Sequence, residues 1–372
     1  MHTRLVLLSG IVASLLALAA NAAVTATRLT APPGFHVELF ATNVPNVRQL
    51  AVSSDGLVFA GSREAGKVYA IIDRDHDFVA DEVVTIADDL HLPSGIALHH
   101  GALYVGAVEK ILRYDDIAAH YREHPRPVVL PVQLPSDEAH GWKYLGFGPD
   151  GMLYVPVGAP CNICLPRAPY ASILRMQPDG RAVSVFATGI RNSVGFAWHP
   201  VTGELWFTDN GRDWLGDDSP SCELNRVTKP GQHFGFPFIH GGDTPDPEFG
   251  DGHAARDYVP PAAKLGAHVA PLGVLFYRGK QFPAEFRRSL LIAEHGSWNR
   301  SHKVGYRVVQ VELNAHSEVI RSAPFVTGWL QNEEVSGRPA DVAELSDGSV
   351  LISDDTAGVI YRVRYGMPAT RS

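Results

Sequence analysis

The sequence predicts an all-β fold, a six-bladed β-propeller of four-stranded antiparallel blades. The first observation is a pattern of a small-residue run, a turn and an alternating apolar strand, seen at 50–59 and again at 146–155. It returns about six times at a spacing of roughly 45–60 residues, which is typical of propeller blades. The second observation is turn chemistry, because Asp-Gly pairs such as Asp55-Gly56 and Asp150-Gly151 favour tight turns between strands.

Six segments are expected to supply the inner strands of the blades, and helix signals are weak except near 115–123 and 283–288. The longest irregular segments are 211–221 and 240–270, and both are rich in Gly, Pro and Asp. In a propeller the strand-connecting loops converge around the channel, so unusual residues in equivalent loops become neighbours. The expected inner strands lie near 49–59, 95–105, 145–155, 194–208, 272–277 with 290–294, and 341–353.

The first 22 residues are expected to be a signal peptide. Arg4 precedes an apolar run over 5–20, and Ala20-Asn21-Ala22 offers a cleavage pattern. The run is short for a membrane span, although an uncleaved anchor is the alternative. We therefore expect residues 23–372 to form a single propeller domain that is periplasmic or secreted.

The composition limits the kinds of partner that the protein is expected to bind. The formal net charge is −8, and no basic run is present, which argues against nucleic acid and favours a small-molecule partner. Of the three cysteines, Cys161 and Cys164 are candidates for a local disulfide in an oxidising compartment or for two reduced thiols, and Cys222 is left over. Leu165 stands where a c-type haem motif needs His, so covalent haem is not expected.

Three loop entries carry candidate chemistry. His140 precedes the third inner strand and could serve as a general base. Arg191 and Asn192 precede the fourth and supply donors for carboxylate, quinone or phosphate oxygens. The acidic segment 209–223 is either a Ca²⁺ loop or a solvated loop.

A second acidic run, at 73–77, is predicted to be a polar turn. It resembles the start of an EF-hand calcium loop. However, Phe78 stands where that loop requires Gly, and Val84 stands where it requires Glu.

Taken in order, the motifs resemble those of the soluble glucose/sorbosone dehydrogenases that depend on pyrroloquinoline quinone (PQQ), on the sorbosone-dehydrogenase-like side. The resemblance spans nearly the whole mature chain. The motifs that carry it are the His140 entry with Gly148-Pro-Asp-Gly151, Gly189-Ile-Arg-Asn192, Asp209-Asn-Gly-Arg212, Glu223-Leu-Asn225 with His233-Phe-Gly-Phe-Pro237, His268-Val-Ala-Pro271, Glu294-His-Gly-Ser-Trp-Asn-Arg300 and Gly337-Arg-Pro-Ala-Asp341.

The resemblance implies a propeller that holds PQQ and Ca²⁺ at the channel mouth and oxidises an aldose, a sorbosone-like sugar or a related hydroxyl or hydrated aldehyde by hydride transfer to PQQ. Electrons would then pass to an acceptor that the sequence does not identify. By position, His140 would be the base, and Arg191 would stabilise the reduced quinone with Asn192 beside it. The other implied contacts are Arg300, Lys303 and Arg338 for PQQ carboxylates, Gln49 and Trp142 for substrate, and the carbonyls of Gly211 and Arg212 with Glu223 for Ca²⁺.

Departures from the family pattern limit these expectations. Ala139 and Ala159 stand where glucose-oxidising members carry acids, so we expect weaker sugar recognition and a base that lacks its orienting carboxylate. Cys222-Glu223 replaces an Asp-Glu pair that helps to bind a further Ca²⁺. Glucose is therefore not the expected substrate.

Two other classes of function remain as alternatives. A Ca²⁺-dependent lactonase-type hydrolase would need metal-binding side chains around the channel axis, for which Asn192, Asp209 and Glu223 are the nearest candidates. A non-enzymatic ligand-binding propeller of the NHL type would not need His140, Arg191 and Arg338 in three different blades.

Overall fold

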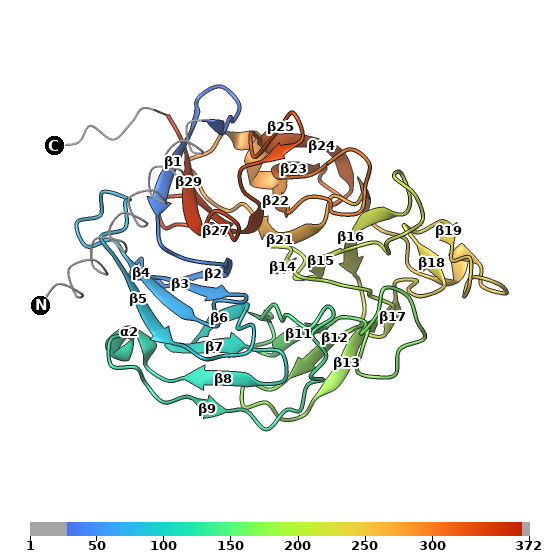
Figure 1. Ribbon diagram of the computed structural model, residues 1–372, viewed down its shortest axis with the longest axis horizontal. Helices are drawn as coiled ribbons and strands as arrows, with labels where there is room; N and C mark the ends of the chain where they lie inside the picture. The colour runs from blue at the N-terminus through green and yellow to red at the C-terminus, as the bar shows by residue number, and fades with distance from the viewer. Residues whose placement is uncertain (1–27, 367–372) are drawn as a thin grey trace, which may run out of the picture.

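The computed structural model describes residues 28–366, and these form six small antiparallel sheets around a common axis (Figure 1). The predicted six-bladed propeller is confirmed, and each predicted inner segment overlaps the innermost strand of one blade. The expected signal peptide, residues 1–22, lies outside the described residues. Within 28–366 no helix is long and apolar enough to cross a membrane.

The first three blades follow one another along the chain, each built from consecutive strands. Blade one comprises β2 (Val47–Val52), β3 (Val58–Ser62), β4 (Val68–Ile72) and β5 (Glu82–Ala87). Blade two comprises β6 (Gly95–His99), β7 (Ala102–Gly106), β8 (Ile111–Tyr114) and β9 (Val128–Val129). Blade three comprises β10 (Gly146–Phe147), β11 (Leu153–Val157), β12 (Ser172–Met176) and β13 (Ser184–Thr188), with β17 (Gln232–His233) added in parallel to β13.

The last three blades complete the ring. Blade four comprises β14 (Phe196–Trp198), β15 (Leu205–Asp209), β16 (Ser221–Val227) and β20 (Ala263–Ala267). Blade five comprises β21 (Pro271–Phe276), β22 (Ser289–Glu294), β23 (Arg307–Leu313) and β24 (Val319–Val326). Blade six comprises β27 (Pro339–Glu344), β28 (Val350–Asp354), β29 (Val359–Tyr365) and, at its outer edge, β1 (Phe35–Ala41).

Two features of this topology go beyond the repeat. The strand β1 pairs with β29 from the far end of the chain, with Phe35 opposite Tyr365, and so closes the ring. Between β16 and β20 the chain leaves blade four, adds β17 to blade three and forms the hairpin of β18 (Ile239–His240) and β19 (Thr244–Pro245) and the short helix η1 (Ala255–Asp257). The other short elements are α2 (Ile117–His120), η2 (Ala284–Arg288) and the hairpin of β25 (Leu330–Gln331) and β26 (Glu334–Val335).

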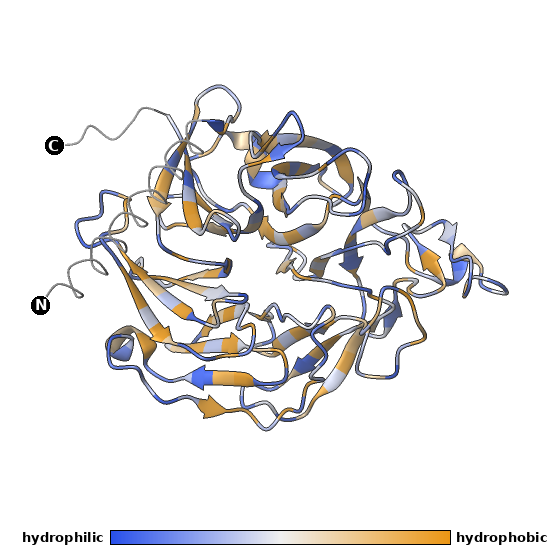
Figure 2. Ribbon diagram, in the orientation of Figure 1, coloured by the Kyte–Doolittle hydropathy of each residue, from blue (hydrophilic) through white to orange (hydrophobic). Residues whose placement is uncertain are grey.

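Every junction between neighbouring blades contains its own apolar cluster. For example, Phe59 and Val68 of blade one pack with Leu103 of blade two, and Trp206 of blade four packs with Ile292 of blade five. Each blade is therefore covered on both faces, and strands such as β7 and β11 are buried along their whole length. Figure 2 shows the matching apolar stretches along the strands. Full burial of one Val, Leu, Ile or Phe side chain contributes about 1.5–3 kcal/mol.

The inner strands lie too close together for large residues at some points. A Cβ on Gly195 would lie 2.0 Å from the carbonyl oxygen of Leu272, so glycine is required where blades four and five meet. The side chain of Gln49 bridges three blades, because its amide nitrogen donates to the Leu145 carbonyl (2.7 Å) and its oxygen accepts from the Ile96 and Leu145 amides (both 2.9 Å).

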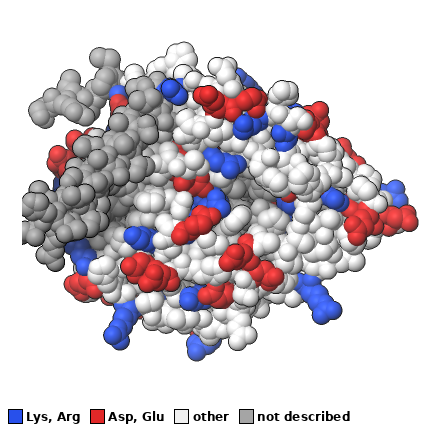
Figure 3. Space-filling view, in the orientation of Figure 1, with Lys and Arg blue, Asp and Glu red and all other residues white. Residues whose placement is uncertain are grey.

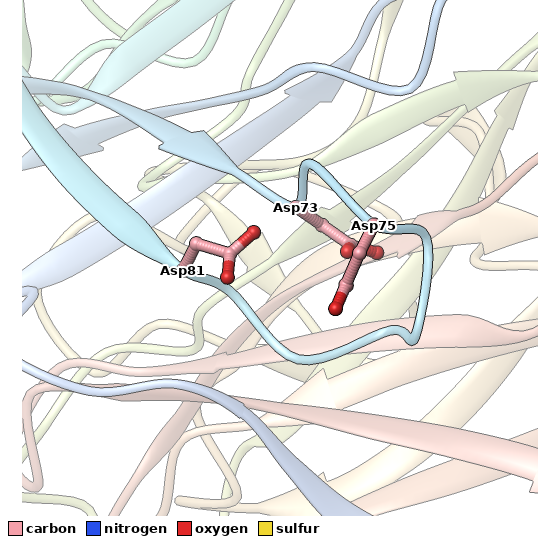
Figure 4. A group of neighbouring side chains, drawn as sticks. All are labelled: Asp73, Asp75 and Asp81. Atoms are coloured by element: carbon pink, nitrogen blue, oxygen red, sulfur yellow. The ribbon is translucent and has the colours of Figure 1, made fainter. Parts of the chain in front are cut away.

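The acidic run between β4 and β5 forms a polar turn, as expected (Figure 4). One carboxylate oxygen each of Asp73, Asp75 and Asp81 lie within 4.8 Å of one another. Their acceptors stabilise the turn itself, since Asp73 accepts from the amide of Phe78 (3.0 Å) and Asp81 accepts from that of Arg74 (2.7 Å).

Candidate active site

A pocket of about 320 Å³ lies where segments of blades one, three, four, five and six converge. Every lining segment is a strand end or a connection next to the channel, as the fold predicts. Of the sequence-predicted residues it brings together His140, Trp142, Arg191, Asn192, Gly211 and Arg338. The remaining lining residues are Arg48, Arg63, Asn210, Asp213, Cys222, His268, Ala270, Leu272, His295, Gly296 and Trp298.

His140 is oriented by a main-chain acceptor. Its Nδ1 lies 2.8 Å from the carbonyl oxygen of Ala159, which can only accept, so Nδ1 carries the proton and Nε2 is left as the basic nitrogen. The backbone of His140 is left-handed (φ 50°), and a Cβ on Gly158 would lie 2.6 Å from its Cβ. No carboxylate accepts from His140 among the described residues, and the Ala159 carbonyl takes the place of the missing acid.

Burial lowers the pKa of His140 to about 4, and the nearby positive charge of Arg191 adds to the effect. A lowered pKa means that the imidazole is neutral, and so able to accept a proton, at every pH above about 4. In protein without cofactor we expect the His140 imidazole resonances to titrate near pH 4 in an NMR titration, where an unperturbed histidine titrates near 6.5. His140→Asn identifies the signal by removing it, and a midpoint at or above 6.5 would contradict the expectation.

Arg191 is almost fully buried, and each of its three guanidinium nitrogens has a partner. Nε donates to the Asn162 carbonyl (2.9 Å), Nη1 to the carbonyls of Asn210 (3.2 Å) and Gly211 (2.9 Å), and Nη2 to the side chains of Asn162 (2.7 Å) and Asp213 (3.1 Å). The turn that carries it is held by Asp209, which accepts from the amides of residues 191 (2.9 Å) and 192 (2.6 Å). The guanidinium position is therefore fixed in advance, as electrostatic catalysis requires.

A disulfide joins Cys161 to Cys164 and encloses Asn162, the main partner of Arg191; Cys222 is buried and free. Replacing both bonded cysteines by alanine is expected to cost about 2 kcal/mol of unfolding free energy, because the closed loop is so short. We also expect turnover to fall several-fold, since Asn162 is then less firmly held.

Urea unfolding and steady-state kinetics measure the two effects of the missing disulfide. Asn162→Ala, with the disulfide intact, is the matched control and should reproduce the loss of turnover. A double-cysteine variant with unchanged turnover would show that the disulfide does not position Arg191.

The turn after β15 offers oxygen ligands to the pocket. The carbonyls of Asn210 and Gly211 and the carboxylate of Asp213 all contact the Arg191 guanidinium. Hard oxygens of this kind are the donors that Ca²⁺ requires, and each has a lone pair that Arg191 does not use. The turn can therefore supply part of the six to eight oxygens that Ca²⁺ takes.

Glu223 and Asp209 lie behind this turn and do not line the main pocket. They face each other across the β15–β16 pair and border a separate small cavity, which Gly211 also borders. Burial and the nearby negative charge of Asp209 raise the pKa of Glu223. Burial also raises the pKa of Asp209. The predicted ligand Arg212 does not line the main pocket, and its side chain pairs with Asp246.

Three further residues predicted to contact cofactor or substrate lie outside the main pocket. Gln49 is engaged in the bridge between blades described above. Arg300 pairs with Asp218 (2.7 Å), and Lys303 donates to the Glu333 carbonyl (2.8 Å).

Three positive charges, the arginine wall, are made by Arg48, Arg63 and Arg338 along one side of the pocket. Sequence reasoning predicted Arg338 but missed Arg48 and Arg63. Arg48 of β2 is 4 % exposed and forms an ion pair with the buried Asp355 (2.8 Å). The only signal in the sequence was that Arg48 stands beside the predicted Gln49. With Arg191, four guanidinium groups line one pocket, which fits a ligand that carries several carboxylates.

Asp355 also accepts from His295 Nε2 (2.9 Å). Burial lowers the pKa of His295 to about 4, so this imidazole is neutral at pH 7. Although burial by itself raises it, contact with His295 and Arg48 holds the pKa of the Asp355 carboxyl well below its usual range.

The profile of the family described as Glucose / Sorbosone dehydrogenase matches residues 128–362, which is more than half of the chain. The chain belongs to the glucose/sorbosone dehydrogenase family. Over 351 residues, 91 % of each chain, it is 34 % identical to an uncharacterized protein of Borreliella burgdorferi. A PQQ-dependent pyranose dehydrogenase of Coprinopsis cinerea is 31 % identical over 136 residues, which cover 32 % of this chain and 18 % of that protein.

Several solved structures share the fold of this chain. The holo form of the Coprinopsis cinerea pyranose dehydrogenase PQQ domain superimposes with a TM-score of 0.76 at 18 % identity, over 90 % of this chain and 97 % of that one. The PQQ-bound aldose sugar dehydrogenase of Streptomyces coelicolor gives 0.64 at 20 % identity, over 90 % and 99 %. A calcium structure of a Trichoderma reesei carbohydrate-active enzyme of family AA12 gives 0.77 at 18 % identity, over 91 % and 97 %.

Proposed function

We propose that this protein is a PQQ- and Ca²⁺-dependent sugar dehydrogenase that oxidises an aldose, a sorbosone-like sugar or a related hydroxyl or hydrated aldehyde. The observation that carries the proposal is that one pocket holds both a histidine with a free basic nitrogen and four arginines. We propose PQQ as the cofactor because the chain belongs to this family and is similar to a PQQ-dependent pyranose dehydrogenase.

When bound, PQQ would supply the electrophile that accepts the hydride. His140 Nε2 would take the proton from the substrate hydroxyl, since its neutral form prevails above about pH 4. Arg191, fixed by its five hydrogen bonds, would present positive charge to the oxygen on which negative charge develops, with Asn192 beside it. The lone pairs of Asn210, Gly211 and Asp213 that Arg191 does not use would supply part of the six to eight oxygen ligands of Ca²⁺.

One further feature supports a substrate other than glucose, and another supports the binding of a sugar ring at the pocket mouth. Ala139 offers no carboxylate beside the base. Trp214 and Trp298 are each 66 % exposed, their ring centroids are 5.4 Å apart, and Trp298 lines the pocket. Exposed aromatic rings of this kind provide an apolar face with a polar edge, to which a sugar ring can pack.

The distribution of charged side chains over the surface gives no reason to expect a polyanionic partner. Figure 3 shows basic and acidic side chains interspersed over the visible face, with no broad basic area. We further propose that residues 1–22 direct export to the periplasm or the medium, which amino-terminal sequencing of the mature protein would test by a start near Ala23.

The test is to add PQQ and excess Ca²⁺ to the purified protein and to follow dye reduction with a panel of aldoses, sorbosone and lactones. The proposal expects PQQ-dependent dye reduction with at least one aldose or aldehyde, and an absorbance change on PQQ binding. A protein that neither binds PQQ nor reduces dye with any of them would overturn it. Lactone hydrolysis in the absence of PQQ would favour a hydrolase.

A further inference from the structure

The arginine wall (Arg48, Arg63 and Arg338) carries more positive charge than its neighbours balance. Asp355 is the buried carboxylate on this side, 2.8 Å from Arg48 Nη1 and 3.5 Å from Arg63 Nη1. Glu64, which is largely exposed, holds Nη2 of Arg63 (2.8 Å). Arg338 donates to the neutral carbonyls of His295 (3.0 Å) and Gly296 (2.5 Å). Among the side-chain ion pairs of residues 28–366, Arg48 and Arg63 therefore have only Asp355 and Glu64 as partners, and Arg338 has none.

Two buried donors in this wall lack an acceptor among residues 28–366. They are Nε of Arg63 and the indole Nε1 of Trp142. The Arg63 guanidinium lies 5.1 Å from the Trp142 ring centroid, and that of Arg48 lies 5.9 Å from it, so one ring is shared by both cations. A buried donor without an acceptor destabilises the protein, and a ligand with anionic oxygens that reached these donors would remove that cost.

The residues first expected to bind cofactor carboxylates are directed elsewhere. Arg300 donates from Nε to the Asp217 carbonyl (2.9 Å), from Nη1 to the His302 carbonyl (3.0 Å) and from Nη2 to Asp218 (2.7 Å). Lys303 likewise turns to Glu333. Neither residue lines the pocket, whereas all three members of the arginine wall do.

We propose that Arg48 and Arg63 bind carboxylates of PQQ, beside Arg338, in the role first assigned to Arg300 and Lys303. The inference rests on the proposed function. A guanidinium presents a fixed fork of donors that matches a carboxylate, and a charge-assisted pair of this kind is stronger than a neutral hydrogen bond.

The experiment is a titration of PQQ into cofactor-free protein with excess Ca²⁺, followed by quenching of tryptophan fluorescence. Arg63→Gln is the main variant, because Arg63 is at the pocket edge while Arg48 is buried and its loss could unfold the protein. We expect Arg63→Gln to raise the Kd for PQQ at least about tenfold. Arg175→Gln, which removes an arginine that pairs with Asp150 far from the pocket, should change it less than about twofold. Arg300→Gln should behave like Arg175→Gln.

PQQ trimethyl ester is the second probe, because its carboxylates are neutral. If Arg63 acts on a carboxylate, Arg63→Gln should weaken PQQ binding but leave binding of the ester as in the wild type. Equal weakening for both probes, an unchanged Kd for PQQ, or a loss of PQQ binding in Arg300→Gln instead would overturn the inference while leaving the proposed function intact. Wild-type protein that binds neither probe would overturn the proposed function, and the inference with it.

Discussion

His140→Asn is expected to lower kcat by about 10²–10⁴-fold while leaving the Kd for PQQ within about twofold of the wild type. The loss follows because Nε2 of His140 has no hydrogen-bond partner among residues 28–366 and is unprotonated at neutral pH, so it can accept the substrate proton. Asparagine is the sharper substitution than alanine. Its side-chain amide can still donate to the Ala159 carbonyl, and it tolerates the left-handed backbone at this position.

Single-turnover reduction of bound PQQ by substrate measures this effect separately from binding. His140→Ala should show the same loss of rate together with a lower stability, because alanine is strained at φ 50°. A His140→Asn enzyme that keeps more than about a tenth of the wild-type rate would show that proton transfer to His140 is not part of the reaction.

The fold was predictable because its determinants are local. The Asp-Gly turns and the repeated apolar strands specify each blade separately, and burial of both faces of every blade follows once the blades pack side by side. The closing strand β1 was not predictable in this way, since Phe35 and Tyr365 meet only through the whole ring.

The position of Arg48 shows why part of the site could not be derived, whereas Gln49 was named only through the family resemblance. Alternation along a strand places neighbouring residues on opposite sides, but the pairing of β2 with β3 shifts register between Val47 and Leu50. The alternation of side chains along β2 is therefore interrupted between Val47 and Leu50, and so it does not predict which of these side chains enters the pocket. The bulge directs Gln49 to the main chain of blades two and three, while Arg48 lines the pocket.

The orienting partner of His140 was missed for a different reason. Ala159 was interpreted through its side chain, which cannot accept a hydrogen bond, but its carbonyl oxygen does. A main-chain acceptor is present at every residue, so the identity of residue 159 carries no signal of it. Its position depends on the end of β11 and on Gly158, which allows the backbone of His140 to approach.

Arg191→Lys is expected to lower kcat by about 10²–10³-fold, because lysine keeps the positive charge but loses the planar fork that fixes its position. The guanidinium has five hydrogen bonds, to Asn162, Asn210, Gly211 and Asp213, and an ammonium group has only three donors. The charge alone would therefore be less precisely placed relative to the oxygen that becomes negative.

Comparing Arg191→Ala with Arg191→Lys separates the effect of Arg191 on catalysis from its effect on stability. Removing the charge leaves the partly buried Asp213 without its ion-pair partner. Breaking a fully buried pair costs about 3–5 kcal/mol, so we expect a smaller loss here. We therefore expect Arg191→Ala to lose both stability and PQQ binding, whereas Arg191→Lys should lose rate with a smaller loss of stability. Urea unfolding, PQQ titration and single-turnover kinetics on both variants measure the three quantities. A lysine variant with wild-type kcat would show that fixed donor geometry at this position is not needed, and that charge at the turn is sufficient.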